Sequence, residues 1–180
     1  MAASLAPIDT EVASTSGSAT TKTTFAANLP ADATTGATYT SSMTAYDSLG
    51  TANSIQITWT KTAANTWTAS FGNPTLASDS STTTGTTSGS VTVSFNSDGS
   101  LASTSPSPPT ISVSGWTDGA TDSTISLDLG TVGKTDGLTQ YASGESTPTV
   151  NVTSISSDGL AYGKLSSIAV GKNGVVNATY

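Results

Sequence analysis

Residues 43–71 read MTAYDSLGTANSIQITWTKTAANTWTASF, and the alternation of apolar and hydroxyl residues in this stretch decides the fold class. The large apolar residues take every second position, with Ile55, Ile57 and Trp59 in one run and Trp67, Ala69 and Phe71 in the next. Successive side chains of a strand point to opposite faces, so each run predicts a half-buried strand. The linking residues KTAAN (61–65) are short enough for a hairpin loop. This spacing predicts that Trp59 and Trp67 meet as a cross-strand aromatic pair.

The same alternation recurs along the chain and predicts further strands. These cover residues 38–45, 90–95, 111–116, 123–129, 149–155, 163–170 and 174–180. The Asn173-Gly174 pair predicts a hairpin turn, while the all-polar stretch 78–90 predicts an exposed mobile loop. No long stretch shows a helical apolar stripe. We therefore expect an all-β domain with almost no helix, either an antiparallel barrel or a sandwich, with long Ser/Thr/Gly loops.

The domain organisation follows from where this periodicity begins. Residues 1–20 show no period and end in small polar residues, which predicts a linker or entry segment. Residues 21–180 suit a single domain, since a chain of 180 residues is long enough to bury a core. No apolar run approaches the roughly 20 residues of a membrane span, and the first residues lack the pattern of a secretory signal.

Composition excludes several classes of function. The formal net charge is −7, from 12 acidic and 5 basic residues, so we expect no basic patch for nucleic acid. The chain has no His and no Cys, which excludes Ser–His–Asp and Cys–His catalysis and thiolate metal sites. We expect no enzyme activity, no cofactor and no membrane partner.

The remaining candidate site residues are aspartates and aromatics. Asp98, Asp118, Asp136 and Asp158 each precede a Gly, a pattern that favours turns over catalysis or calcium binding. Asp122 and Asp128 lie in or beside a predicted strand, on its wet face. A glycan-binding platform is the alternative for Trp59, Trp67, Trp116 and Tyr141. Alternation with Ile and Phe favours the core for Trp59 and Trp67, while Trp116 stays open between core and surface. We therefore predict no catalytic, cofactor-binding or metal-binding residue.

The order of the motifs resembles the bacterial flagellar hook protein family. The motifs are ATTKTTFAANLP (19–30), the Tyr-Asp-Ser-x-Gly segment within 43–71, VSFNSDGSL (93–101), GLTQYAS (137–143) and SSDGLAYGKLSSIAVGKNGVVNATY (156–180). The resemblance spans residues 19–180. Members of that family carry apolar, heptad-like helical segments at both termini, and this chain has neither. It therefore resembles the middle of a longer hook subunit.

The resemblance implies a structural protein, exported through the flagellar type III route without cleavage and located outside the cell in the hook. In that family the subunits stack helically into the curved tube between motor and filament. The middle of the chain forms outer domains that contact neighbouring hook subunits, and other axial proteins adjoin the ends of the hook. The alternatives are another axial protein of the flagellum, such as a distal rod subunit, or a secreted β-rich adhesin or glycan-binding module.

Overall fold

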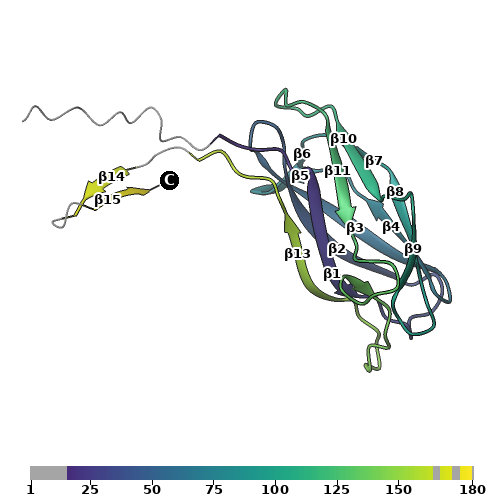
Figure 1. The fold of residues 1–180 in the computed structure, drawn as a ribbon. Helices are drawn as coiled ribbons and strands as arrows, with labels where there is room; N and C mark the ends of the chain where they lie inside the picture. Colours follow the sequence, from purple (N-terminus) through teal and green to yellow (C-terminus); the bar gives the residue numbers. More distant parts are fainter. Residues whose placement is uncertain (1–15, 164–166, 172–174, 180) are drawn as a thin grey trace, which may run out of the picture.

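The computed structural model describes residues 16–163, 167–171 and 175–179. All its regular elements are strands, as expected (Figure 1). In chain order they are β1 (Lys22–Asn28), β2 (Thr38–Tyr46), β3 (Ala52–Ala63), β4 (Thr66–Phe71), β5 (Thr75–Leu76), β6 (Asp79–Thr83), β7 (Thr86–Ser88), β8 (Ser90–Phe95), β9 (Leu101–Ser105), β10 (Thr110–Ser114), β11 (Ser123–Asp128), β12 (Leu138–Thr139), β13 (Asn151–Ser157), β14 (Ser167–Val170) and β15 (Val176–Thr179). The Asn173-Gly174 turn and the predicted linker up to residue 15 lie outside the described residues.

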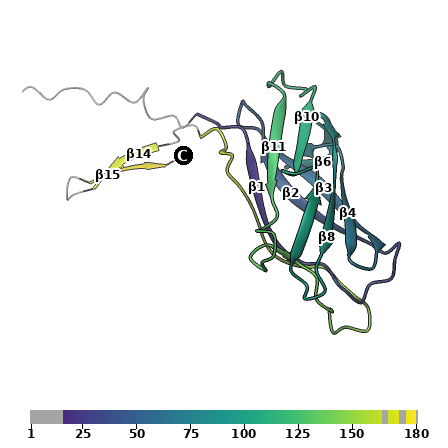
Figure 2. The same ribbon diagram turned by 45° about the vertical axis from the view of Figure 1, so that its right-hand side comes forward.

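Two sheets face each other as a sandwich with one partly closed side (Figures 1 and 2). The seven-stranded sheet has the order β6-β5-β3-β4-β8-β9, with β2 also paired to β3. The six-stranded sheet has the order β12-β1-β11-β10-β7, with β13 also paired to β1. Most pairs are antiparallel, as predicted, but β1 runs parallel to both β11 and β12. The sequence left barrel and sandwich open. The two sheets form a sandwich that is partly closed on one side.

The chain passes between the two sheets at Gly89, which separates β7 from β8. Gly89 has a φ of 109°, a conformation that residues with a Cβ rarely adopt. The resulting bend lets consecutive strands belong to different sheets. On another side, the Ser157 hydroxyl of β13 donates to the Thr44 carbonyl of β2 at 2.6 Å, so the two sheets also approach each other there.

The core lies between the sheets and is built by the alternating residues. Fully buried members include Ile55 and Ile57 of β3, Trp67 of β4, Val91 and Val93 of β8, and Ile111 and Ile125 of the facing sheet. One continuous apolar cluster contains all of them. A buried side chain of this kind contributes about 1.5–3 kcal/mol to folding. Packing between alternating strands therefore holds the two sheets together.

Two local predictions were wrong. The stretch 78–90 is not a loop without structure: it contains β6 and β7, and its Thr84 is buried. The Thr84 hydroxyl donates to Asn53 Oδ1 at 2.6 Å, so a polar residue joins the interior through a hydrogen bond. The loop after β3 is also shorter than KTAAN, because β3 continues through Lys61 to Ala63.

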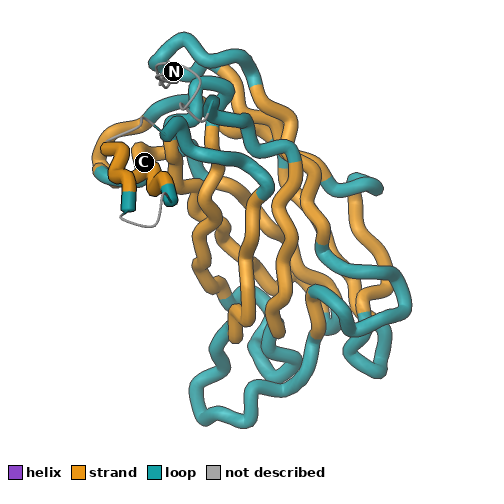
Figure 3. The backbone as a smooth tube through the Cα atoms, turned by 60° about the vertical axis from the view of Figure 1, so that its left-hand side comes forward, coloured by secondary structure: helices purple, strands orange, loops and turns teal. Residues whose placement is uncertain are grey.

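The loops gather at the two ends of the sandwich (Figure 3). At one end, Ser18 and Leu160 exchange backbone hydrogen bonds of 2.9 Å, so the chain enters and leaves the sandwich side by side. We call this the crossing end, and the opposite end, which carries residues 29–37, 64–65, 96–100 and 130–141, the loop end. Among the described residues, β14 and β15 pair only with each other. Whether residues 21–180 form a single domain stays a prediction.

Candidate functional site

The three tryptophans are buried and cannot form a ligand-binding platform. Their relative exposures are 3% for Trp59, 0% for Trp67 and 6% for Trp116. Trp116, which the sequence left open, belongs to the core, and its indole N–H donates to Ser123 Oγ at 3.2 Å. Tyr141 alone of the four candidates is exposed, at 48%. A single exposed ring does not make the aromatic surface on which the glycan-binding alternative depended.

The predicted Trp59–Trp67 pair is wrong because the register differs by two residues. Trp59 lies opposite Ala69, and Trp67 lies opposite Lys61. The ring partners of the tryptophans come from other strands: Phe25 meets Trp59 edge-on at 6.4 Å, and Tyr39 lies 5.9 Å from Trp67. Both tryptophans still point into the core, so their structural role is confirmed while their pairing is not.

Lys61 is a buried cation that the sequence did not reveal. Its Nζ donates to the carbonyls of Ala31 at 2.5 Å and Ala33 at 2.9 Å, and lies 5.8 Å from the centre of the Trp67 ring. Burial lowers the pKa of Lys61, and the nearby Asp32 carboxylate opposes this effect. The ammonium therefore ties the loop between β1 and β2 to the core through main-chain oxygens and an aromatic face.

Gln140 continues this network at the loop end. The Trp67 indole N–H donates to Gln140 Oε1 at 2.8 Å, and Gln140 Nε2 donates to Asn65 Oδ1 at 3.0 Å. The amide thus connects the buried indole with the tight turn at residues 64–65 and the segment after β12. Buried polar groups that are fully partnered in this way fix one arrangement of the loops. The network has a structural role and offers no free group for chemistry.

The Asp-Gly aspartates act in turns or join segments. Asp98 accepts from the Ser100 amide at 3.0 Å and Asp118 from the Ala120 amide at 3.1 Å, as turn aspartates do. Asp136 instead accepts from the Thr131 amide at 2.7 Å. Asp158 accepts from the Thr21 amide at 2.8 Å and so fastens the end of β13 to the start of β1. Hydrogen bonds of this kind favour the ionised carboxylate, and the pKa of each of these four groups lies below its ordinary value.

Asp122 and Asp128 are also occupied by structural contacts. Asp122 accepts from the Gly115 amide at 3.2 Å. Asp128 pairs with the Lys22 ammonium at 2.8 Å, on the outer face of the six-stranded sheet. This ion pair is half-exposed, so it contributes little to stability. Neither carboxylate lies opposite a second one in an arrangement suited to acid and base catalysis.

A second buried polar cluster lies at the crossing end. Asp47, 1% exposed, accepts from the amides of Leu49 at 2.9 Å and Thr51 at 3.0 Å. The Asn53 amide group lies 3.4 Å from its other oxygen. This carboxylate shapes the turn after β2, in the segment Asp-Ser-Leu-Gly (47–50). The described part of the chain contains no group of three or more His, Cys, Asp or Glu side chains that could hold a metal ion.

Two carboxylates, Asp47 and Asp118, line a hollow of about 190 Å³ at the crossing end, where Thr51 donates its hydroxyl to Asp118 at 3.0 Å and its amide to Asp47 at 3.0 Å. Another hollow, of about 460 Å³, is lined by Asn28, Ser143, Glu145 and residues 149–152, with a single carboxylate among them. Within the described residues, no helix is long and apolar enough to cross a membrane. The prediction that the chain has no catalytic, cofactor-binding or metal-binding residue remains a prediction.

The outer face of the seven-stranded sheet is a regular polar surface. Its outward positions on β3, β4, β8 and β9 carry mainly Ser and Thr, in cross-strand register. Ser94 and Ser103 are joined through their hydroxyls at 2.6 Å, and Thr68 and Thr92 at 3.4 Å. We call this surface the hydroxyl face. It has the chemistry of a wet contact surface.

Comparison with known proteins identifies a flagellar protein family. The sequence model of the family described as "flagellar basal body protein FlaE D2 domain" matches residues 12–160. A search of curated protein sequences finds no match. Among solved structures, the chain is similar to a 32 kDa fragment of the flagellar hook protein FlgE from Caulobacter crescentus, with 20% identity and a TM-score of 0.45. That match covers 67% of this chain and 46% of the fragment, so this chain spans under half of its length.

Proposed function

Because the chain belongs to the FlaE D2 domain family of flagellar hook proteins, we propose that it is an outer domain of a hook subunit. The observation that carries this proposal is the family match over residues 12–160, which covers both sheets of the sandwich. In this role the subunit polymerises with other hook subunits into the curved, flexible joint between motor and filament. The hook lies outside the cell, and the ends of the hook contact other axial proteins of the flagellum.

The proposed work of the domain is mechanical. The chain has no His and no Cys, the side chains that most often serve proton transfer and nucleophilic attack at neutral pH. The hydroxyl face supplies a surface for contacts with neighbouring subunits. Contacts between small polar surfaces are shallow and weak, and weak contacts exchange readily as a tube bends. We further propose that residues 1–20 link this domain to the rest of the subunit and that residues 21–180 act together.

The experiment is an in-frame deletion of residues 20–180 from the parent gene, with swimming and hook formation as readouts. We expect loss of motility with shortened or absent hooks. Secretion of the shortened subunit into the medium is measured in parallel, so that failed export is distinguished from failed assembly. Normal hooks and normal motility would contradict the proposed function.

A narrower experiment tests the hydroxyl face. Thr58→Asp combined with Thr68→Asp places two charges on that face, and we expect weaker hook polymerisation because the charges must be desolvated on contact. The matched control is Ser112→Asp with Thr124→Asp on the outer positions of β10 and β11 in the other sheet. Equal effects of the two pairs would show that the hydroxyl face has no special role. A glycan array probed with the isolated chain tests the adhesin alternative, for which we expect no binding.

A further inference from the structure

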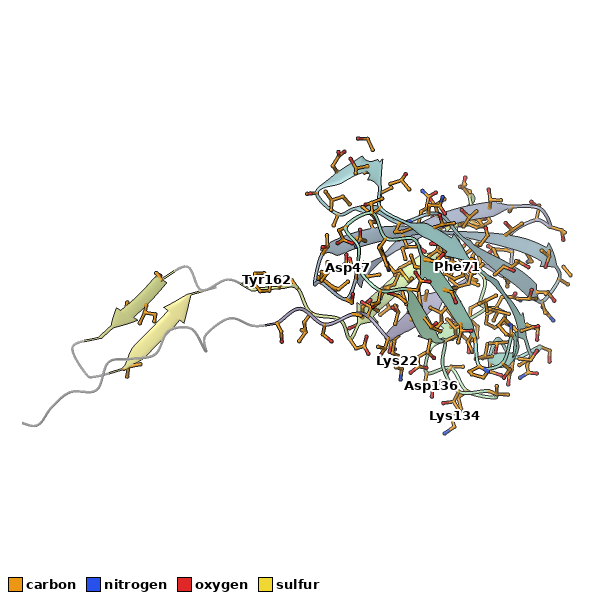
Figure 4. All side chains as sticks on the ribbon, turned by 90° about the horizontal axis from the view of Figure 1, so that it is seen from above. Lys22, Asp47, Phe71, Lys134, Asp136 and Tyr162 are labelled. Carbon is orange, nitrogen blue, oxygen red and sulfur yellow. The ribbon has the colours of Figure 1, made fainter. Side chains whose placement is uncertain are left out.

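The two chain segments that meet at the crossing end also contact the turn after β2. We call residues 16–18 and 160–162 together the neck. Its two segments are joined by the Ser18–Leu160 backbone bonds, and the Tyr162 amide donates to the Gly50 carbonyl of the turn at 3.3 Å. Figure 4 shows Tyr162 on the segment that leaves the sandwich, near the turn of Asp47. The neck is therefore bonded to the sandwich as well as to itself.

Glycines allow the neck and the turn to touch through their backbones. A Cβ on Gly17 would lie 2.5 Å from the Gly50 Cα, and a Cβ on Gly50 would lie 2.5 Å from the Tyr162 nitrogen. The atoms met are backbone atoms, which cannot rotate aside as the end of a long side chain can. Gly50 also has a φ of 82°, a conformation that favours glycine. Both positions need glycine because three backbone segments pack directly against one another.

The turn that receives the neck is itself fixed. The Asp47 carboxylate, 1% exposed, accepts from two amides of the turn. On another side, Ser48 Oγ accepts from the Thr121 amide at 2.9 Å, and the Thr51 hydroxyl donates to the Asp118 carboxylate at 3.0 Å. Asp118 and Thr121 belong to the loop between β10 and β11 of the six-stranded sheet. The turn, which joins β2 and β3 of the seven-stranded sheet, is therefore held by contacts with both sheets.

We propose that the contact among Gly17, Gly50 and Tyr162 is a rigid joint, which fixes the direction of the neck relative to the sandwich. Two segments held only to each other can swing about the few residues at their base, as hinges do. The turn removes this freedom, because a swing in one direction breaks the Tyr162–Gly50 bond and a swing in the other drives the Gly17 backbone into the turn. The sandwich then rotates together with the neck as one body. This inference does not depend on the hook assignment.

The experiment measures residual dipolar couplings and hydrogen exchange of backbone amides in the 180-residue chain. In the wild type we expect the couplings of Ser18, Leu160 and Tyr162 to fit the alignment tensor of the sandwich. Gly17→Ala adds one methyl group that meets the Gly50 Cα. We therefore expect the Tyr162 coupling to depart from that tensor and the Tyr162 amide to exchange faster, on the order of tenfold.

The matched control is Gly72→Ala, which should leave the neck unchanged. Neither Gly17 nor Gly72 has a positive φ, so alanine brings no backbone strain at either position. The methyl group at Gly72 would have its nearest contact at 3.7 Å, an ordinary van der Waals distance. The two variants thus differ in whether the new methyl group meets the turn.

A second pair of variants separates the contact from backbone strain. Gly50 and Gly36 have φ values of 82° and 90°, so alanine strains the backbone at both positions. At Gly50 the added Cβ would meet the neck, whereas at Gly36 it would meet nothing within 4 Å. We expect the neck couplings to change in Gly50→Ala and to stay as in the wild type in Gly36→Ala. Unchanged tryptophan fluorescence will show that the sandwich of each variant is folded.

Wild-type neck couplings that do not fit the tensor of the sandwich would overturn the inference, because the neck would then swing freely. Equal neck couplings and equal Tyr162 exchange in Gly17→Ala and Gly72→Ala would also overturn it, since the contact with Gly50 would then have no part in fixing the neck.

Discussion

Each end of the sandwich holds one buried charged side chain, and the two are held in opposite ways. At the loop end, the Lys61 ammonium is bound by the carbonyls of Ala31 and Ala33. At the crossing end, the Asp47 carboxylate is bound by the amides of Leu49 and Thr51. In both cases the main chain of a loop, and not an opposite charge, supplies most of the direct contacts. The comparison teaches that buried charge can fix loop shape in a chain with very few charged residues.

The largest effect is expected from replacing Trp67, whose ring contacts Gln140 and lies beside Lys61 at the loop end. Trp67→Ala deletes a fully buried side chain, leaves Gln140 without its indole partner and removes the ring beside Lys61. We expect a loss of about 3–5 kcal/mol in the free energy of unfolding, measured by urea denaturation. Trp67→Phe retains most of the ring and should lose less. Equal losses for both variants would show that the Gln140 bond, and not packing, dominates at this end.

The next effect tests the crossing end. Asp47→Ala leaves the amides of Leu49 and Thr51 without their acceptor in a buried turn. An unsatisfied buried donor costs about 1–3 kcal/mol, so we expect a total loss of about 2–4 kcal/mol by the same denaturation. Asp122→Ala, on an exposed loop of the same end, is the control. A loss below that of the control would mean that water replaces the carboxylate without cost.

Lys61→Met should cost less than Asp47→Ala. Methionine retains most of the apolar stem and removes a charge whose burial is unfavourable, but it leaves the carbonyls of Ala31 and Ala33 unpaired. We expect a net loss of about 1–2 kcal/mol. The folded-state pKa of Lys61 is lowered, so the folded chain binds fewer protons there than the unfolded chain. Wild-type stability should therefore rise relative to Lys61→Met as the pH approaches 10.5 from below. A parallel pH profile for both proteins would contradict this.

The smallest effect concerns a carboxylate that joins the two chain segments of the crossing end. Desolvation raises the pKa of Asp158. Hydrogen bonds from the Thr21 hydroxyl and from the amides of Lys22 and Thr21 together lower this pKa by more than desolvation raises it, so the net shift is downward. Such a group stabilises the fold above its ordinary pKa of 3.8, and this contribution is lost as the pH falls through the lower folded-state value. Asp158→Asn should cost about 1 kcal/mol at pH 7.

Thermal melts between pH 2 and pH 7 check this prediction. Below about pH 4 the difference between the wild type and Asp158→Asn should shrink, since the wild-type carboxylate becomes protonated. The control is Glu145→Gln, which makes the same carboxylate-to-amide change on the exposed loop after β12. A difference that stays constant in acid would show that Asp158 acts through its shape and not through its charge.

The parts of the fold that the sequence predicted are those with local alternation. Strands β4 and β8 lie where the pattern placed them, because large apolar residues there repeat at every second position. Strand β1 was not predicted, because Phe25 is the only large apolar residue in its sequence, KTTFAAN, and the other residues on the same face are small. The polar stretch 78–90 forms two strands, which main-chain hydrogen bonds hold, and buries Thr84 between them. Its sequence is polar throughout and predicts neither the strands nor the burial of Thr84.

The polar interior was harder to predict than the strands. Lys61 was assigned to the loop with the other linking residues of KTAAN, and its burial depends on carbonyls about thirty residues earlier in the chain. Gln140 meets Trp67 across 73 positions of sequence. The register of Trp59 was predicted wrongly because all of KTAAN was taken as loop, whereas β3 continues through its first three residues. Contacts set by distant segments leave no local pattern to read.

The pairing of Ser18 with Leu160 has a mechanical consequence. Force that reaches the sandwich through the chain enters and leaves at neighbouring points on one end, so the strands between them carry almost no tension. A pull that separates the two segments loads the Tyr162–Gly50 and Ser18–Leu160 backbone bonds before it reaches the ladder between β1 and β13. The body of the domain therefore lies outside the load path and keeps its shape while its attachment moves.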